Sequence, residues 1–94
     1  MDKLNPDILL QRIKEARGWY VDGNSIKKVF RTKGFPQTAG LVTLISTICQ
    51  QFDHHPDYLT MKYSEIEVSF STHTAGGITE KDIEIALEIN KFAE

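Results

Sequence analysis

Residues 54–73, HHPDYLTMKYSEIEVSFSTH, contain the clearest fold signal in the chain. Apolar residues alternate with polar ones in two runs, which are Leu59, Met61 and Tyr63, and then Ile66, Val68 and Phe70. Strict alternation places one side of a strand against a core and the other side toward water. We therefore expect two neighbouring strands, each with one apolar face.

A second pair of strands is predicted in the N-terminal half. Residues 19–21 lead into an Asp-Gly-Asn turn signal at residues 22–24, and residues 26–33 resume as a strand rich in β-branched and aromatic residues, as in a β-hairpin. This segment also carries four basic residues, which are Lys27, Lys28, Arg31 and Lys33. Because basic and apolar residues alternate, we expect a solvent-facing side of a strand here rather than a phosphate-binding stripe, and no nucleic-acid partner.

Three helices are predicted around these strands. Apolar positions recur at helical spacing through residues 5–17, and Gly18 follows as a helix stop. A second helix is predicted from Pro36, which suits a first helical turn, to Phe52, and a third from residue 79 to the C-terminus. The order helix, two strands, helix, two strands, helix predicts one α+β domain over residues 1–94, with an antiparallel sheet covered on one face.

The composition is that of a single soluble domain. The 94 residues are 40% apolar and 26% charged, with a net charge of −2. The N-terminus lacks the order of a signal peptide, no apolar run is long enough to span a bilayer, and the single cysteine, Cys49, excludes an internal disulfide. We therefore expect a cytoplasmic protein without a membrane partner.

Self-association is also predicted. A domain of this size buries a modest fraction of its surface, so a further stabilising device is expected. The helix beginning at Pro36 offers one, because its apolar arc, with Leu44 beside Leu41, Ile45 and Ile48, is wider than packing on one sheet requires.

The three histidines, His54, His55 and His73, lie at junctions between predicted elements, where binding sites are usually built. An adjacent pair at a helix end and a third at a strand end indicate one shared site. The helix dipole favours the protonated forms of the pair, and imidazole titrates near neutral pH, so one ring can donate a proton while another accepts one. A three-histidine zinc site is the alternative, although neighbouring side chains in an extended segment diverge.

Residues 79–82 have the spacing of a capping box, in which Asp82 replaces the usual Glu. Capping is the expected role of Asp82. A carboxylate fixed at a helix start close to Gly76 and Gly77 can also orient a nearby histidine.

A set of residues in the second half of the chain forms a recognisable pattern: Asp53, His54, His55, Pro56, Tyr63, Ser71, Thr72, His73, Gly76, Gly77, Thr79 and Asp82. This pattern resembles the signature of the pterin-4a-carbinolamine dehydratase family, and with similar residues upstream the resemblance covers nearly the whole chain. It implies a four-stranded antiparallel sheet with three helices on one side and assembly into dimers or tetramers.

The resemblance also implies a reaction, the dehydration of 4a-hydroxytetrahydropterin during tetrahydropterin recycling, with no metal or organic cofactor. His54, His55 and His73 would surround the pterin ring, and the residues that help to hold it would be Asp53, Ser71, Thr72 and Thr74. We expect His54 and His73 to transfer protons and His55 to bind and orient the ring. The alternative is a non-catalytic member that acts as a dimerisation or assembly cofactor for another protein.

The chain departs from the family pattern at position 50 and in the stretch between Pro56 and Tyr63, which is one residue longer than in animal members. Four residues before His54 the family usually has an acidic or otherwise ionisable residue, and this chain has Gln50. Gln50 can hydrogen-bond a histidine or a pterin amide, but it supplies no charge. We therefore expect a supporting role for Gln50 and for Asp82.

Overall fold

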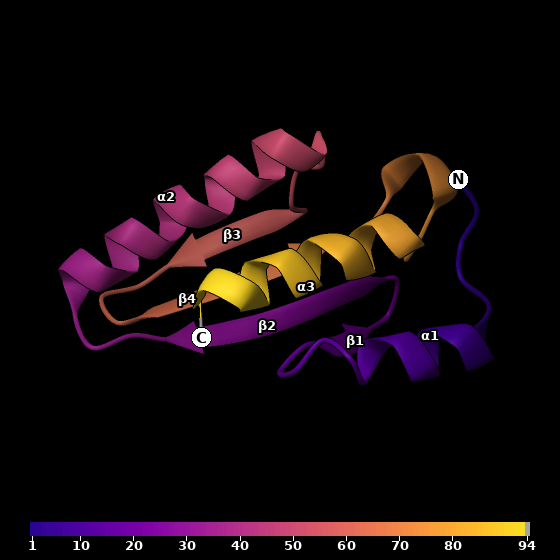
Figure 1. The fold of residues 1–94 in the computed structure, drawn as a ribbon, viewed down its shortest axis with the longest axis horizontal. Coiled ribbons are helices and arrows are strands. Elements are labelled where there is room, and N and C mark those ends of the chain that lie inside the picture. Colours follow the sequence, from indigo (N-terminus) through magenta and orange to yellow (C-terminus); the bar gives the residue numbers. More distant parts are fainter. Residues whose placement is uncertain (94) are drawn as a thin grey trace.

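The chain follows the predicted order of helices and strands (Figure 1). This computed structural model describes residues 1–93. The helices are α1 (Pro6–Ile13), α2 (Phe35–Phe52) and α3 (Glu80–Ala93), and the strands are β1 (Tyr20–Asp22), β2 (Ser25–Arg31), β3 (Tyr58–Met61) and β4 (Glu65–Phe70). A single 3-10 turn, His73–Ala75, follows β4.

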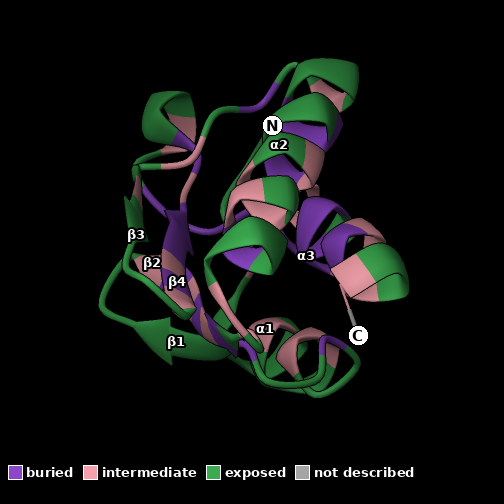
Figure 2. Ribbon diagram, turned by 90° about the vertical axis from the view of Figure 1, so that its left-hand side faces the viewer, coloured by how far each residue is buried: buried purple, intermediate pink, exposed green. Residues whose placement is uncertain are grey.

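The strands form one four-stranded sheet in the order β1-β2-β4-β3, and all neighbours are antiparallel. The central pair, β2 and β4, has the longest register, from Ile26 opposite Phe70 to Arg31 opposite Glu65. The helices lie on one side of this sheet, and the other side faces solvent (Figure 2). The predicted α+β architecture is therefore confirmed.

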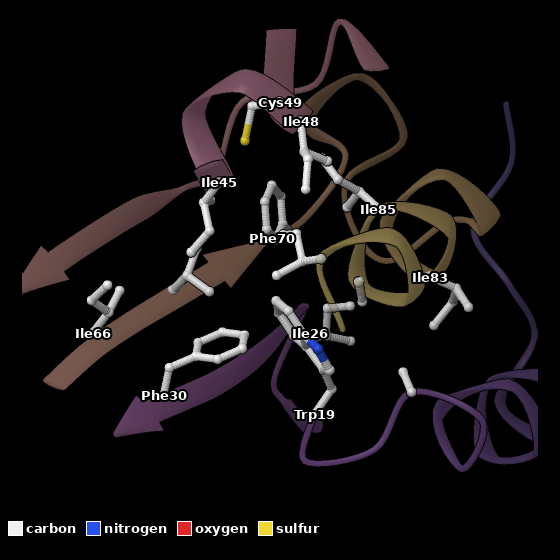
Figure 3. Close-up of a cluster of buried hydrophobic side chains, with 14 of the residues drawn as sticks. Trp19, Ile26, Phe30, Ile45, Ile48, Cys49, Ile66, Phe70, Ile83 and Ile85 are labelled. Carbon is white, nitrogen blue, oxygen red and sulfur yellow. The ribbon is translucent and has the colours of Figure 1, made fainter. Parts of the chain in front are cut away.

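The core lies between the covered face of the sheet and the two longer helices (Figure 3). Alternation along β4 places Ile66, Val68 and Phe70 on that face, where all three are fully buried. The fully buried helix residues that join the same core are Ile45, Ile83, Ile85, Ala86 and Ile89. Trp19, after α1, completes the core with its ring 5.9 Å from that of Phe70 and 6.1 Å from that of Phe30.

Lys28 belongs to the covered face of β2 and is only 7% exposed. Its Nζ donates to the carbonyl oxygen of Arg17 (2.9 Å) and to Oδ1 of Asn90 (2.8 Å). The expectation that the basic residues of this strand face solvent is therefore wrong for Lys28. Neighbouring residues in a strand point to opposite faces. Lys27 lies on the outer face, where its Nζ contacts Asp22, so Lys28 lies on the covered face and connects the loop after α1 to α3.

The first helix is shorter than predicted. Asn5 caps it, since its side chain accepts a hydrogen bond from the N–H of Ile8 (2.9 Å), but α1 ends at Ile13 rather than at residue 17. The N–H of Ala16 then bonds the carbonyl oxygen of Ile13 (3.1 Å) in a tighter turn. This turn brings Ala16 and Trp19 into the core, and their burial is the reason for the early end of the helix.

β3 also ends earlier than predicted, at Met61. Tyr63 lies in the turn before β4, is 72% exposed, and has its ring 5.9 Å from that of Phe35. The N–H of Lys62 donates to the carbonyl oxygen of Glu65 (2.8 Å) and closes this turn. The expected place of Tyr63 on the apolar face of the strand is therefore wrong.

α2 spans almost the predicted residues and contains no charged side chain. On its exposed side, the hydroxyls of Thr43, Ser46 and Thr47 each donate to the carbonyl oxygen four residues earlier. This side of the helix therefore presents small, internally satisfied side chains. Among the described residues, no helix combines the length and the apolar character needed to cross a membrane.

Gly18 should not tolerate a side chain. Its φ of +84° is left-handed, and an added Cβ would lie 2.7 Å from Cε of Lys28. Lys28 cannot withdraw without losing its bonds to Arg17 and Asn90. Gly18→Ala should therefore lower the free energy of unfolding by about 1–2 kcal/mol for the backbone conformation and about 1–3 kcal/mol for the overpacking, measured by urea denaturation.

Gly23→Ala is the matched control, because Gly23 also has a positive φ, +62°, but has no atom within 4 Å of the added Cβ. It should show the conformational cost alone. Equal losses in the two variants would contradict the role given to Lys28.

Candidate active site

A pocket of about 270 Å³ opens where the end of α2 meets the segment after β4. It is lined by Asp53, His54, His55, Ser71, Thr72, His73, Thr74 and Lys81. Every residue expected to hold the substrate lies in this lining. Lys81, in the first turn of α3, was not predicted, and its Nζ donates to the carbonyl oxygen of Asp53 (3.0 Å).

The end of α2 sets the directions of the adjacent histidines. Asp53 has φ 51° and ψ 46°, the left-handed conformation that commonly terminates a helix. The N–H groups of Asp53 and His54 donate to the carbonyl oxygens of Gln50 (3.2 Å) and Cys49 (3.0 Å). The chain turns there so that His54 is buried and His55 is exposed.

His54 is held on two sides. Its ring stacks on Phe70 with centroids 5.6 Å apart and an interplanar angle of 22°. Its Nε2 lies 2.5 Å from Oδ1 of the fully buried Asp82. The other oxygen of Asp82 accepts from Oγ1 of Thr72 (2.9 Å) and from the N–H of Thr79 (2.8 Å). Asp82 therefore makes the capping contact expected at the start of α3 and contacts a histidine as well.

The second ring nitrogen of His54 is available to the pocket. Within residues 1–93, Nδ1 of His54 makes no hydrogen bond to the protein. Every buried side-chain nitrogen or oxygen in this range makes one, so Nδ1 is not a buried atom. Nδ1 therefore reaches open space rather than the core. Because Asp82 occupies Nε2, proton transfer by His54 would use Nδ1.

His73 also contacts a carboxylate, that of Asp57, which sequence reasoning missed. Nε2 of His73 lies 3.1 Å from Oδ1 of Asp57. Burial raises the pKa of Asp57, but hydrogen bonds from Ser71, Ser69, Ser25 and His73 outweigh burial and hold this pKa below its ordinary value. Asp57 is therefore ionised at neutral pH and can only accept, so Nε2 of His73 carries the hydrogen.

A signal for this contact was present in the sequence. Ser69, Ser71 and His73 follow one another at the spacing of two residues that places side chains on one face of an extended chain. Asp57 comes close to these residues because it directly precedes Tyr58, which pairs with Ser69, and because its N–H donates to the carbonyl oxygen of Ser69 (2.7 Å). The contact between His73 and Asp57 could be recognised only once the pairing of β3 with β4 was known.

Gln50 and His55 meet at a neighbouring pocket of about 230 Å³ between α2 and β3. His55 lines both pockets, whereas Gln50 lines only the second one. The structure therefore places Gln50 beside His55 and outside the lining that His54 and His73 share. Across residues 1–93, no three or more His, Cys, Asp or Glu side chains are grouped so that they could hold a metal ion.

The fold and this pocket define a small α+β protein with a histidine site supported by carboxylates. The chain belongs to the family described as pterin 4 alpha carbinolamine dehydratase, whose model matches residues 2–92. A protein of Sulfolobus acidocaldarius provisionally named pterin-4-alpha-carbinolamine dehydratase is 40% identical over 90 residues, which are 96% of this chain and 98% of the relative. A relative with the same name from Roseiflexus castenholzii is 33% identical and covers 95% of each chain.

Solved structures agree on the fold. A crystal structure described as a transcriptional coactivator/pterin dehydratase from Brucella melitensis superposes with a TM-score of 0.92, at 28% identity, over 99% of this chain and 100% of that one. A pterin dehydratase-like protein described as a RuBisCO assembly factor in the alpha-carboxysome superposes with a TM-score of 0.71, at 16% identity, over 84% and 93% of the two chains. The second likeness concerns the fold alone.

Removal of the Asp82 carboxylate should destabilise the fold. Asp82→Ala leaves the N–H of Thr79 and Nε2 of His54 without their acceptor, and the hydroxyl of Thr72 keeps only its contact with the hydroxyl of Thr79. Since an unsatisfied buried polar group costs about 1–3 kcal/mol, we expect a loss of about 3 kcal/mol or more in urea unfolding. Glu84→Ala, at an exposed position on the same helix, should change stability by less than about 0.5 kcal/mol. Similar losses in both variants would refute the role of Asp82.

Proposed function

We propose that this protein is a dehydratase, a carbon–oxygen lyase that converts a 4a-hydroxytetrahydropterin, such as 4a-hydroxytetrahydrobiopterin, into the quinonoid dihydropterin and water. The observation that carries the proposal is that His54 and His73 line one pocket and that each contacts a carboxylate through Nε2. Family membership supplies the substrate class. In this proposal the reaction serves tetrahydropterin recycling in the cytoplasm.

The chemistry needs two proton transfers. In a 4a-carbinolamine the hydroxyl group sits on a saturated carbon next to a ring N–H. Once an acid protonates the hydroxyl oxygen, the nitrogen lone pair expels water and forms the C=N bond, and a base removes the nitrogen proton. Each transfer by a positioned side chain contributes about 10²–10⁴-fold to the rate. No step calls for a Lewis acid or an organic cofactor.

The surroundings of the three histidines support different roles. His54 and His73 each have one nitrogen occupied by a carboxylate and Nδ1 left for proton transfer. His55 is exposed at the boundary of two pockets, where it can contact the pterin ring from the side. We therefore assign proton transfer to His54 and His73 and substrate binding mainly to His55.

The second candidate function is a non-catalytic dimerisation or assembly cofactor. It is favoured by the uncharged exposed side of α2, which offers a surface for another helix. A pocket with two histidine–carboxylate pairs has no purpose in such a scaffold, and we therefore rank the dehydratase first.

Substitution of the histidines tests the catalytic roles. His54→Ala and His73→Ala should chiefly lower kcat, by the 10²–10⁴-fold expected for a missing acid or base, or about 2.7–5.4 kcal/mol of transition-state stabilisation. His55→Ala should chiefly raise KM. The assay follows dehydration of a synthetic 4a-hydroxytetrahydropterin below the unfolding temperature of each variant.

The same assay supplies its controls. Added zinc or a chelator should leave the rate unchanged, since the proposed steps move only protons. Wild-type turnover in the double variant with His54→Ala and His73→Ala would contradict the dehydratase proposal and favour the scaffold.

We also propose that the protein is a homodimer or homotetramer that assembles through α2. Analytical ultracentrifugation at micromolar concentration should then show no persistent monomer. Thr43→Lys, which adds a charge to the uncharged side of α2, should shift the protein toward smaller species, whereas Glu84→Lys on the exposed side of α3 should not. A stable wild-type monomer would contradict this assembly.

A further inference from the structure

Asp57 lies between the end of α2 and the start of β3, where its side chain is 19% exposed. Its two oxygens have separate partners. Oδ2 accepts from the hydroxyls of Ser25 and Ser69, each at 2.9 Å, which fixes it to β2 and β4. Oδ1 accepts from the hydroxyl of Ser71 (2.5 Å) and from Nε2 of His73 (3.1 Å). One side of the carboxylate is therefore anchored in the sheet while the other holds the edge of the pocket.

His73 has little else to fix its ring. Its side chain is 83% exposed, and within the described residues the ring makes no other hydrogen bond and no aromatic stack. His54 differs, since it is buried, stacked on Phe70 and bonded to Asp82. An exposed imidazole without a partner rotates freely and exchanges its tautomers, so the orientation of His73 depends on Asp57.

We propose that Asp57 is a positioning residue for the site, which holds His73 as the tautomer with hydrogen on Nε2 and leaves Nδ1 for proton transfer. The anchoring of Oδ2 in the sheet fixes the direction of Oδ1, and so the direction of the ring. This inference rests on the proposed dehydratase function for its kinetic consequence, whereas the tautomer of His73 can be observed independently of any activity.

Asp57→Asn tests the contact with almost no change of shape. The amide oxygen can still accept from Ser25 and Ser69, which leaves the amide NH₂ opposite Ser71 and His73. Because NH₂ is a donor, Nε2 of His73 must then lose its hydrogen to Nδ1 or lose the contact. The corresponding substitution in a catalytic triad acts in the same way, by imposing the wrong histidine tautomer.

The experiment combines ¹⁵N NMR of the histidine rings, at a pH where they are neutral, with dehydratase kinetics and thermal unfolding. Wild-type His73 should show hydrogen on Nε2. In Asp57→Asn this signature should shift toward hydrogen on Nδ1 or toward a mixture of tautomers. The value of kcat should fall about tenfold, which is less than the full contribution of a positioned acid or base because His73 itself is still present, and KM should change little. Asp22→Asn, the same substitution at a carboxylate of β1 that contacts Lys27 rather than His73, is the matched control and should keep the His73 signature and kcat close to wild type.

A merely structural role for Asp57 predicts a different result, a lower unfolding temperature with the His73 signature and kcat unchanged. That result would overturn the proposal. Wild-type protein without dehydratase activity would instead refute the proposed function, and the NMR comparison alone would then decide whether Asp57 sets the tautomer of His73.

Discussion

The buried carboxylate of Asp82 is the contact on which the geometry of the pocket depends. It bonds the N–H of Thr79 at the start of α3, the hydroxyl of Thr72 after β4 and the ring of His54 after α2. Three segments that are distant in sequence therefore meet at one side chain. Because a buried carboxylate is stable only when its oxygens are satisfied, these contacts are favoured together, and the end of the sheet and the ends of both long helices are fixed relative to one another.

The two histidine–carboxylate pairs have the same contact but different surroundings. Asp82 is fully buried and holds a ring that is also stacked on Phe70, so the position of His54 is inseparable from the fold. Asp57 lies near the surface and contacts the exposed His73, so this second pair is held from the sheet rather than from inside the core. In the proposed dehydration, each of these two histidines would transfer one proton. The exposed side of α2 is separate from this chemistry and can serve assembly.

Local patterns predicted much of the fold and, with the family resemblance, the pocket lining. Alternation over residues 65–70 was sufficient for β4, and the capping spacing predicted the start of α3, because both depend on neighbours in the chain. Lys28 was misplaced because Lys27 is equally basic, and only the packed core decides which of the two points inward. Asp57 was missed because its partners come from β2 and β4, and Tyr63 was misplaced because a turn hydrogen bond ended β3 first.

The most direct test of the account is the rate at which the wild-type protein dehydrates a freshly generated 4a-hydroxytetrahydropterin, followed by the appearance of the quinonoid product. The account predicts that protein present at far less than one equivalent converts all of the substrate, many times faster than buffer alone. Product formation at the rate in buffer, with the protein folded and at every protein concentration, would contradict it.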